Sequence, residues 1–159
     1  MSEPASAGPD VRYPPPLLFA LGIVAGWLLY QAFPLPLVGA TARSAAALFG
    51  WLLVALGTGL AGWGLATLLG AGTPIRPNRP ASTLVTHGPF RMSRNPMYLG
   101  LSLVYLGVTL LVNAAWIALL LPLVLAVLCL TVIRHEERYL AATFGIAYDE
   151  YRRRVRRWL

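Results

Sequence analysis

The sequence predicts an all-α integral membrane protein with four transmembrane helices and a C-terminal amphipathic helix. Hydrophobic residues make up 57% of the chain and charged residues only 12%, whereas about 25% of the residues in a soluble domain are charged. No acidic residue occurs between Tyr13 and His135, and the apolar residues form long uncharged runs, as expected of helices surrounded by lipid. With 159 residues the chain is long enough for one domain, which we place at residues 17–159.

The first two helices are predicted at residues 17–33 and 45–70. Residues 1–16 are expected to form a disordered leader that ends in a run of prolines, and further prolines follow the first helix. The second run contains the pattern G-x-G-x-x-G at residues 57–62. No strand precedes this pattern, so a dinucleotide-binding fold is not expected. The glycines instead indicate close contact between two membrane helices.

The last two transmembrane helices are predicted to form a helical hairpin. Residues 97–133 carry no formal charge, and one helix of this length would measure roughly 55 Å. The hydrocarbon core of a bilayer is only about 30 Å thick. We therefore expect helices at residues 97–112 and 115–133, with a turn at Asn113 between them.

Two polar segments flank the hairpin. The loop at residues 73–96 is rich in proline and arginine, and a loop of this length in a small domain is usually functional or disordered. In residues 134–158, large apolar residues recur at spacings of three and four, which predicts an amphipathic helix along the membrane face. Gly145 is the point at which this helix could divide in two.

The arginines predict the orientation of the chain. All thirteen basic residues are arginine. With four crossings, the N-terminus, the loop and the C-terminal tail lie on one side of the membrane, and Arg43 is the only arginine on the other side. Positive residues mark the cytoplasmic side, so we expect the loop, the C-terminus and the site between them to be cytoplasmic. Membrane lipid is the expected partner, and nucleic acid is not, because the arginines lie at membrane edges.

We expect the functional site at the cytoplasmic face, where the loop and the acidic pair Glu136-Glu137 lie together. A zwitterionic amino-acid group needs an anion for its ammonium and cationic or N–H donors for its carboxylate. Glu136 could supply the first, and an arginine such as Arg94 or a backbone N–H group could supply the second through charge-assisted hydrogen bonds. Pro96 follows at the first turn of a predicted helix, whose N-terminal dipole favours anions.

Two ordered blocks of sequence carry a resemblance to a known family. Residues 84–100 read LVTHGPFRMSRNPMYLG, which is similar to G-x-Y-x-x-x-R-H-P-x-Y-x-G with Phe90 for the first tyrosine and Asn95 for the histidine. The acidic pair is followed by F-G-x-x-Y-x-x-Y at residues 144–151. Together the blocks resemble the isoprenylcysteine carboxyl methyltransferase family, which is related to the membrane phospholipid N-methyltransferases.

The resemblance implies a membrane methyltransferase that uses S-adenosyl-L-methionine and a lipid-like or prenylated small-molecule acceptor. The Glu136 carboxylate would hold the amino group of the donor. From the residues at this face we predict Arg94, Glu136 and Glu137 to be catalytic. The implied cofactor-binding residues are Ser82, Thr83, Leu84, Val85, Phe90, Asn95, Pro96, Met97, Tyr98 and Glu136.

Other functions remain open from the sequence. A metal site is not expected, because the chain has one cysteine and no paired histidine spacing of the kind that zinc sites use. A membrane reductase of similar helical architecture would require a nicotinamide cofactor. A non-enzymatic membrane scaffold would instead use the basic C-terminal helix to bind anionic lipid.

Overall fold

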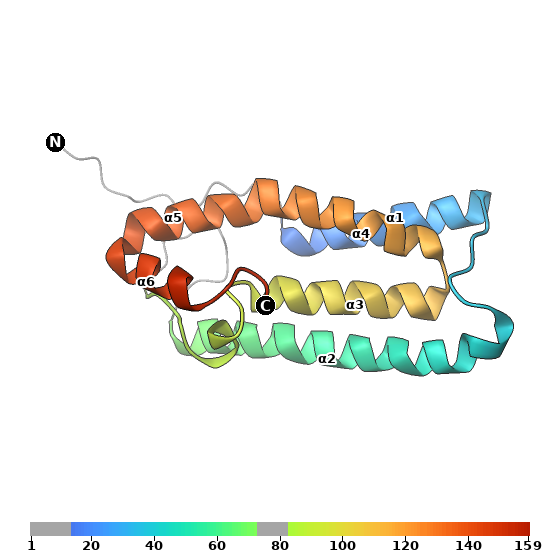
Figure 1. The fold of residues 1–159 in the computed structure, drawn as a ribbon, viewed down its shortest axis with the longest axis horizontal. Coiled ribbons are helices and arrows are strands. Elements are labelled where there is room, and N and C mark those ends of the chain that lie inside the picture. Colours follow the sequence, from blue (N-terminus) through green and yellow to red (C-terminus); the bar gives the residue numbers. More distant parts are fainter. Residues whose placement is uncertain (1–13, 73–82) are drawn as a thin grey trace.

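The computed structural model describes residues 14–72 and 83–159, and these residues are predominantly helical (Figure 1). Residues 1–13 of the predicted leader lie outside the described residues, and the first helix begins two residues before the predicted start. The elements are α1 (Pro15–Ala32), η1 (Ala40–Ala42), α2 (Arg43–Gly70), η2 (Gly88–Arg91), α3 (Pro96–Val112), α4 (Ala115–Leu128), η3 (Cys129–Ile133), α5 (Arg134–Phe144) and α6 (Ile146–Arg154).

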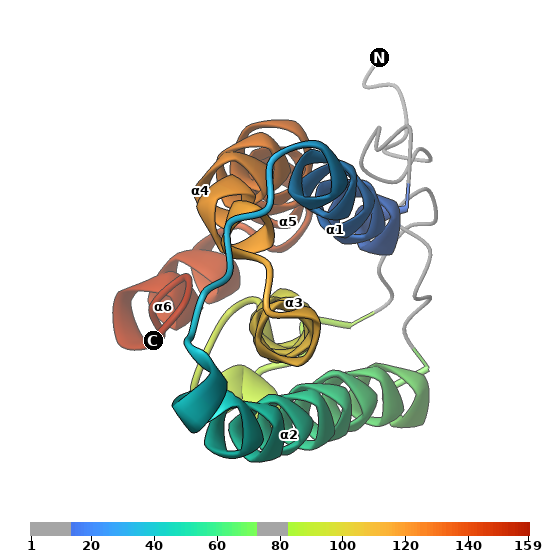
Figure 2. The same ribbon diagram turned by 90° about the vertical axis from the view of Figure 1, so that its right-hand side faces the viewer.

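The long helices form two packed pairs, α2 with α3 and α1 with α4, and α3 lies between α2 and the other pair (Figures 1 and 2). Tyr105 of α3 is fully buried at the centre, where its hydroxyl donates a 2.8 Å hydrogen bond to the Ile117 carbonyl of α4. The ring of Phe19 from α1 meets Tyr105 edge to face. The three helices therefore share one core around Tyr105.

Glycines set the close contact between α2 and α3. Gly50, Gly57 and Gly64 are the buried glycines of α2, seven residues apart. A Cβ atom on Gly57 would lie 2.5 Å from the carbonyl oxygen of Gly100, and one on Gly107 would lie 2.6 Å from the carbonyl oxygen of Gly50. The two backbones therefore touch directly, as in membrane helix pairs joined through small residues.

The G-x-G-x-x-G pattern is only partly used for this contact. Gly59 and Gly62 are exposed, and a Cβ atom on either would meet nothing within 4 Å. Gly57 belongs to the interface because it repeats at the seven-residue spacing of Gly50 and Gly64. A glycine of α2 therefore contacts α3 because of the helix face on which it lies, and not because it belongs to the motif.

The helical hairpin turns at Asn113, as predicted. This residue has a left-handed backbone, with φ 60°, a conformation that asparagine tolerates better than most residues. Its side-chain oxygen accepts hydrogen bonds from the backbone N–H groups of Leu37 and Val38, and its amide donates to the Val38 carbonyl. Asn113 thereby joins the α3–α4 turn to the α1–α2 connection at the end of the bundle opposite to α5 and α6 (Figure 1).

Three helices are long and apolar enough to cross a membrane: Pro15–Ala32, Ala40–Gly70 and Ala115–Phe144, with Pro96–Val112 as a shorter apolar helix. Large hydrophobic side chains on their outer faces are exposed, including Trp27, Leu48 and Trp51. Exposed apolar surface of this extent is typical of contact with lipid. The chain is therefore a multi-pass membrane protein.

The segment predicted as a C-terminal amphipathic helix at residues 134–158 forms two helices, with the break that the sequence allowed. The α5 helix continues α4 without a break through the π-helical turn η3, and α6 is a separate helix. The division falls at Gly145, which has φ 52°, a backbone conformation that residues other than glycine rarely adopt. The combined α4–α5 helix is roughly 45 Å long, so its charged end, α5, extends beyond the predicted crossing at residues 115–133.

Candidate functional site

The loop at residues 83–95 is held against the end of the bundle. Its one helical turn, η2, packs on α2, where Gly88 lies beside Thr67 and has φ 59°. The Phe90 carbonyl accepts a 2.8 Å hydrogen bond from the hydroxyl of Tyr151 in α6. These contacts fix the loop at the end of the bundle that carries α5 and α6.

The C-terminal segment, residues 155–159, runs back beside this loop. The backbone N–H of Arg94 donates to the Arg156 carbonyl at 3.0 Å. The Arg157 carbonyl accepts from the Ser93 hydroxyl at 3.2 Å and from the Asn95 side-chain amide at 3.0 Å. Ser93 and Asn95 are buried, so the start of α3 and the C-terminal segment form one unit.

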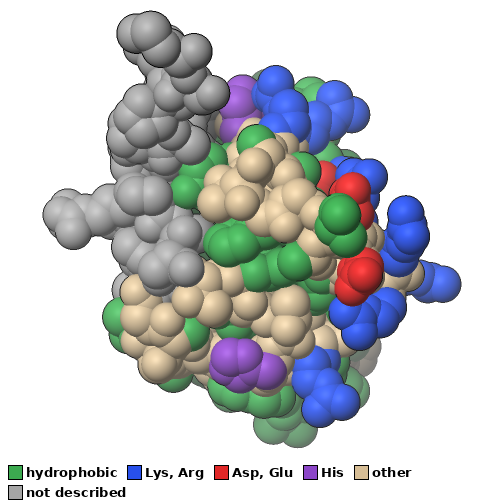
Figure 3. Space-filling view, turned by 90° about the vertical axis from the view of Figure 1, so that its left-hand side faces the viewer, with side chains coloured by type: hydrophobic (Ala, Val, Ile, Leu, Met, Phe, Trp, Pro, Cys, Tyr) green, Lys and Arg blue, Asp and Glu red, His purple; other side chains and the backbone are tan. Residues whose placement is uncertain are grey.

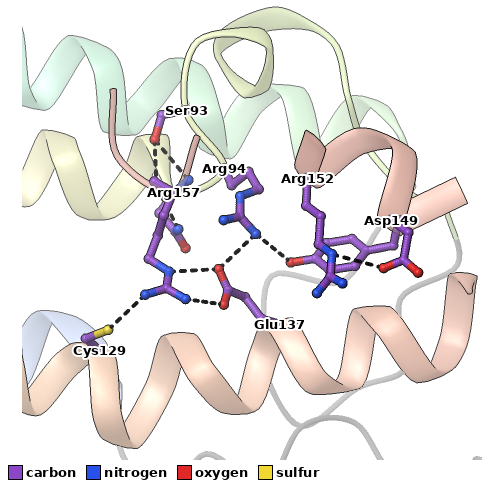
Figure 4. Close-up of polar contacts among 9 residues, drawn as sticks. Ser93, Arg94, Cys129, Glu137, Asp149, Arg152 and Arg157 are labelled. Carbon is purple, nitrogen blue, oxygen red and sulfur yellow. Dashed lines mark hydrogen bonds and ion pairs between the residues drawn. The ribbon is translucent and has the colours of Figure 1, made fainter. Parts of the chain in front are cut away.

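Glu137 lies between two arginines from these two segments (Figure 4). Its Oε1 atom is 3.0 Å from Nη1 of Arg94. Arg157 donates from Nε to Oε1 at 2.9 Å and from Nη2 to Oε2 at 2.7 Å, which is the two-bond geometry of strong arginine–carboxylate pairs. We call Arg94, Glu137 and Arg157 the ion cluster. It joins α5, the loop and the C-terminal segment.

The neighbouring carboxylate, Glu136, faces a different partner. Tyr98 in the first turn of α3 donates a 2.7 Å hydrogen bond from its hydroxyl to Oε1 of Glu136. Burial raises the pKa of Glu136 to about 7; the hydrogen bond from Tyr98 opposes this shift, and the nearby charge of Glu137 adds to it. Near neutral pH, Glu136 is therefore poised between its neutral and charged forms.

Two side-chain nitrogens at this end, Nε of Arg94 and Nδ1 of His135, are buried without a hydrogen-bond partner among the described residues. The Nε atom of Arg94 has no hydrogen-bond partner among the described residues, although Nη1 of the same side chain contacts Glu137 and the Tyr148 hydroxyl. A buried donor without an acceptor is unfavourable. The Arg94 guanidinium therefore keeps one unused donor at this end of the bundle.

The structure brings two pairs of predicted site residues into direct contact. Tyr98 meets Glu136, and Arg94 meets Glu137. Pro96 and Asn95 are buried, and Met97 packs against Gly64 of α2. Ser82 lies outside the described residues. The remaining predicted residues, Thr83, Leu84, Val85 and Phe90, lie along the loop at the same end of the bundle.

Sequence reasoning missed Arg157 and Ser93. Arg157 stands in a run of arginines, and nothing in that run distinguishes the side chain that pairs with Glu137 from those in water. Ser93 donates to the C-terminal segment and accepts the backbone N–H of Asn95 at 3.1 Å. The small polar side chain of Ser93, directly before the R-N-P turn, is the local signal that could have indicated a structural contact.

Comparison with known proteins shows two similarities. The phospholipid methyltransferase family model matches residues 45–147, more than half of the chain. The cobalt-zinc-cadmium resistance protein CzcN of Cupriavidus metallidurans is 36% identical over 77 residues, covering 48% of this chain and 35% of that protein. No solved structure matches the chain. Within residues 14–72 and 83–159, no group of three or more His, Cys, Asp or Glu side chains could hold a metal ion.

Proposed function

The chain belongs to the phospholipid methyltransferase family, and we propose that it is an S-adenosylmethionine-dependent membrane methyltransferase that acts on a lipid-like or prenylated acceptor. The donor would bind where the loop, α3 and α5 meet. The observation that carries this proposal is the contact between Tyr98 and Glu136, which joins two distant sequence blocks at 2.7 Å. Family membership favours methyl transfer over both the reductase and the scaffold alternatives.

The residues present fit the amino-acid end of the donor. The carboxylate of Glu136 is suited to an ammonium group, with Tyr98 holding its position from the first turn of α3. The unpartnered Nε–H of Arg94 is suited to a carboxylate. Ser82, Thr83, Leu84, Val85, Phe90, Asn95, Pro96 and Met97 are proposed to line the rest of the donor site. The side-chain amide of Asn95 already donates to the Arg157 carbonyl, so its proposed role is to shape the site.

The proposed reaction requires little acid–base catalysis from the protein. S-adenosylmethionine supplies a methyl group that its sulfonium already activates, so holding an acceptor in line provides most of the rate. A carboxylate acceptor needs no base, whereas an amine must first be neutral. Arg94 and Glu137 are proposed to keep α5 and the start of α3 at a fixed separation, which positions Glu136 for this purpose.

We further propose that the chain crosses the membrane four times, because α3 crosses it in addition to the three longer apolar helices, and that the site is cytoplasmic. The α3 helix is apolar and antiparallel to α2 over most of its length (Figure 1). Basic side chains gather along one side of the end that carries α5 and α6, with acidic side chains among them (Figure 3). An arginine-rich end of this kind favours the cytoplasmic side, where a soluble donor is supplied and an apolar acceptor can enter from the bilayer.

Donor binding tests the proposal directly. We expect calorimetry of the detergent-purified protein to show binding of S-adenosylhomocysteine. Glu136→Ala should weaken this binding at least about tenfold, because a charge-assisted hydrogen bond contributes about 1.5–3 kcal/mol. Glu150→Ala, which removes an exposed carboxylate from α6, is the matched control and should bind normally. Absence of heat with the wild-type protein, or equal affinity of the Glu136 variant, contradicts the proposal.

The pKa of Glu136 predicts a pH dependence of the same affinity. The charged carboxylate binds the donor ammonium, and its pKa of about 7 means that protonation removes this form as the pH falls. Between pH 7 and pH 5.5 the affinity for S-adenosylhomocysteine should fall about tenfold. Calorimetry at both pH values measures the change. Glu136→Gln should bind weakly and with little pH dependence, and a steep dependence in that variant would assign the titration to another group.

A further inference from the structure

A second candidate binding site lies between the α4–α5 helix and α6. An open cavity of about 530 Å³ is lined by Leu130, Arg134, Glu137, Arg138, Ala141 and Arg152. This volume lies in the range of small-molecule sites. Neither Tyr98 nor Glu136 lines the cavity, so it is separate from the contact on which the proposed donor site rests.

The cavity carries uncompensated positive charge. Glu137 is already bound by two arginines of the ion cluster, and Arg152 pairs with Asp149 at 3.0 Å. Arg134 and Arg138 are exposed, and in the part of the chain that the structure describes neither forms an ion pair with a carboxylate. Two guanidinium groups one helical turn apart are suited to a phosphate group.

An exposed apolar stripe leads from the cavity along the outer face of α4. Leu130 lines the cavity and is 52% exposed, and Leu123 and Leu119 are 60% and 61% exposed. Their spacings of seven and four residues place them on one face of the helix. The same face therefore offers arginines at its charged end and leucines where the predicted crossing meets lipid.

We propose that this face binds one anionic phospholipid, with its phosphate on Arg134 and Arg138 and an acyl chain along Leu130, Leu123 and Leu119. The unpaired positive charge favours a headgroup with net negative charge, such as phosphatidylglycerol, over a zwitterionic one. The apolar stripe favours a lipid over soluble phosphate. This inference does not depend on the proposed donor site, because it rests on other residues.

Binding of fluorescent phosphatidylglycerol to the detergent-purified full chain tests the proposal. The double variant Arg134→Gln, Arg138→Gln should lower the affinity at least about tenfold. The matched control is Arg153→Gln, Arg154→Gln, which removes the same charge from exposed α6 residues outside the cavity, and its affinity should change less than about twofold. A wild-type circular dichroism spectrum and thermal unfolding midpoint would show that both variants fold.

The remaining arms identify the ligand. Fluorescent phosphatidylcholine should bind more weakly than phosphatidylglycerol, and millimolar inorganic phosphate should not displace the lipid. Equal losses in the two double variants would overturn the proposal by showing general attraction to a basic surface. Equal affinity for the two lipids, or displacement by phosphate, would overturn it as well.

Discussion

Valine at position 57 is expected to prevent stable packing of α2 on α3. A Cβ atom there would lie 2.5 Å from the Gly100 carbonyl oxygen and 2.8 Å from the backbone nitrogen of Val104. Both atoms are backbone, so no side-chain rotation relieves the clash and the helices must separate. Gly57→Val should cost about 3 kcal/mol. Thermal unfolding in detergent, followed by circular dichroism, and the fraction of monodisperse protein would measure the loss.

The same substitution two residues along the helix provides the matched control. A Cβ atom on Gly59 would meet nothing within 4 Å, and the residue is exposed. Gly59→Val should therefore change the stability by no more than about 0.5 kcal/mol. Valine is a better helix former than glycine, so helix propensity cannot explain a loss. If both variants lost stability equally, the loss would not come from contact between α2 and α3.

Removal of the Glu137 carboxylate is expected to separate the C-terminal segment from α5. Glu137→Ala leaves Arg94 and Arg157 without their common anion, and the Arg94 side chain is only 15% exposed. Removing one partner of a buried ion pair costs about 3–5 kcal/mol, and partial exposure places this site at the lower end. We expect a matching drop in the thermal unfolding midpoint and weaker binding of S-adenosylhomocysteine, because the start of α3 is held through the same segment.

Asp149→Ala is the control for loss of an acidic group from an ion pair. The Asp149 and Arg152 side chains are 43% and 55% exposed, and exposed pairs contribute at most about 1 kcal/mol. The unfolding midpoint of this variant should stay close to that of the wild type. An unchanged midpoint for Glu137→Ala would show that the ion cluster does not hold the segments together.

The membrane helices could be predicted closely because their signal is local. A long uncharged run has few stable environments other than a bilayer, and prolines or a polar residue such as Asn113 mark where each run ends. The predicted helix at residues 97–112 agrees with α3 to within one residue, and the hairpin turn is confirmed. In the C-terminal region the break that Gly145 allowed is confirmed. The apolar spacing did not show that α5 continues α4 or that α6 ends at Arg154.

The predicted site was partly accessible from sequence. The two blocks indicated that the loop and the acidic pair belong together, and the structure places Tyr98 against Glu136. The roles assigned to Arg94, Glu136 and Glu137 stay predictions until donor binding is measured. The resemblance assigned the donor amino group to Glu136 alone, but the sequence did not indicate the partners of either glutamate. In the fold Glu136 contacts a tyrosine and Glu137 contacts two arginines.

By itself, the sequence determined that the chain is helical, that it crosses a membrane several times and that its charges gather at the helix ends. Tertiary structure alone decided which α2 glycines touch α3 and which arginine of the tail binds Glu137. A membrane-spanning helix needs only a long run of consecutive apolar residues, which can be read directly from the sequence. A contact between distant residues depends instead on which face of a helix points to its neighbour and on where the chain folds back. Residues of the same type, such as the glycines of α2 or the arginines of the tail, therefore differ in role only in the folded protein.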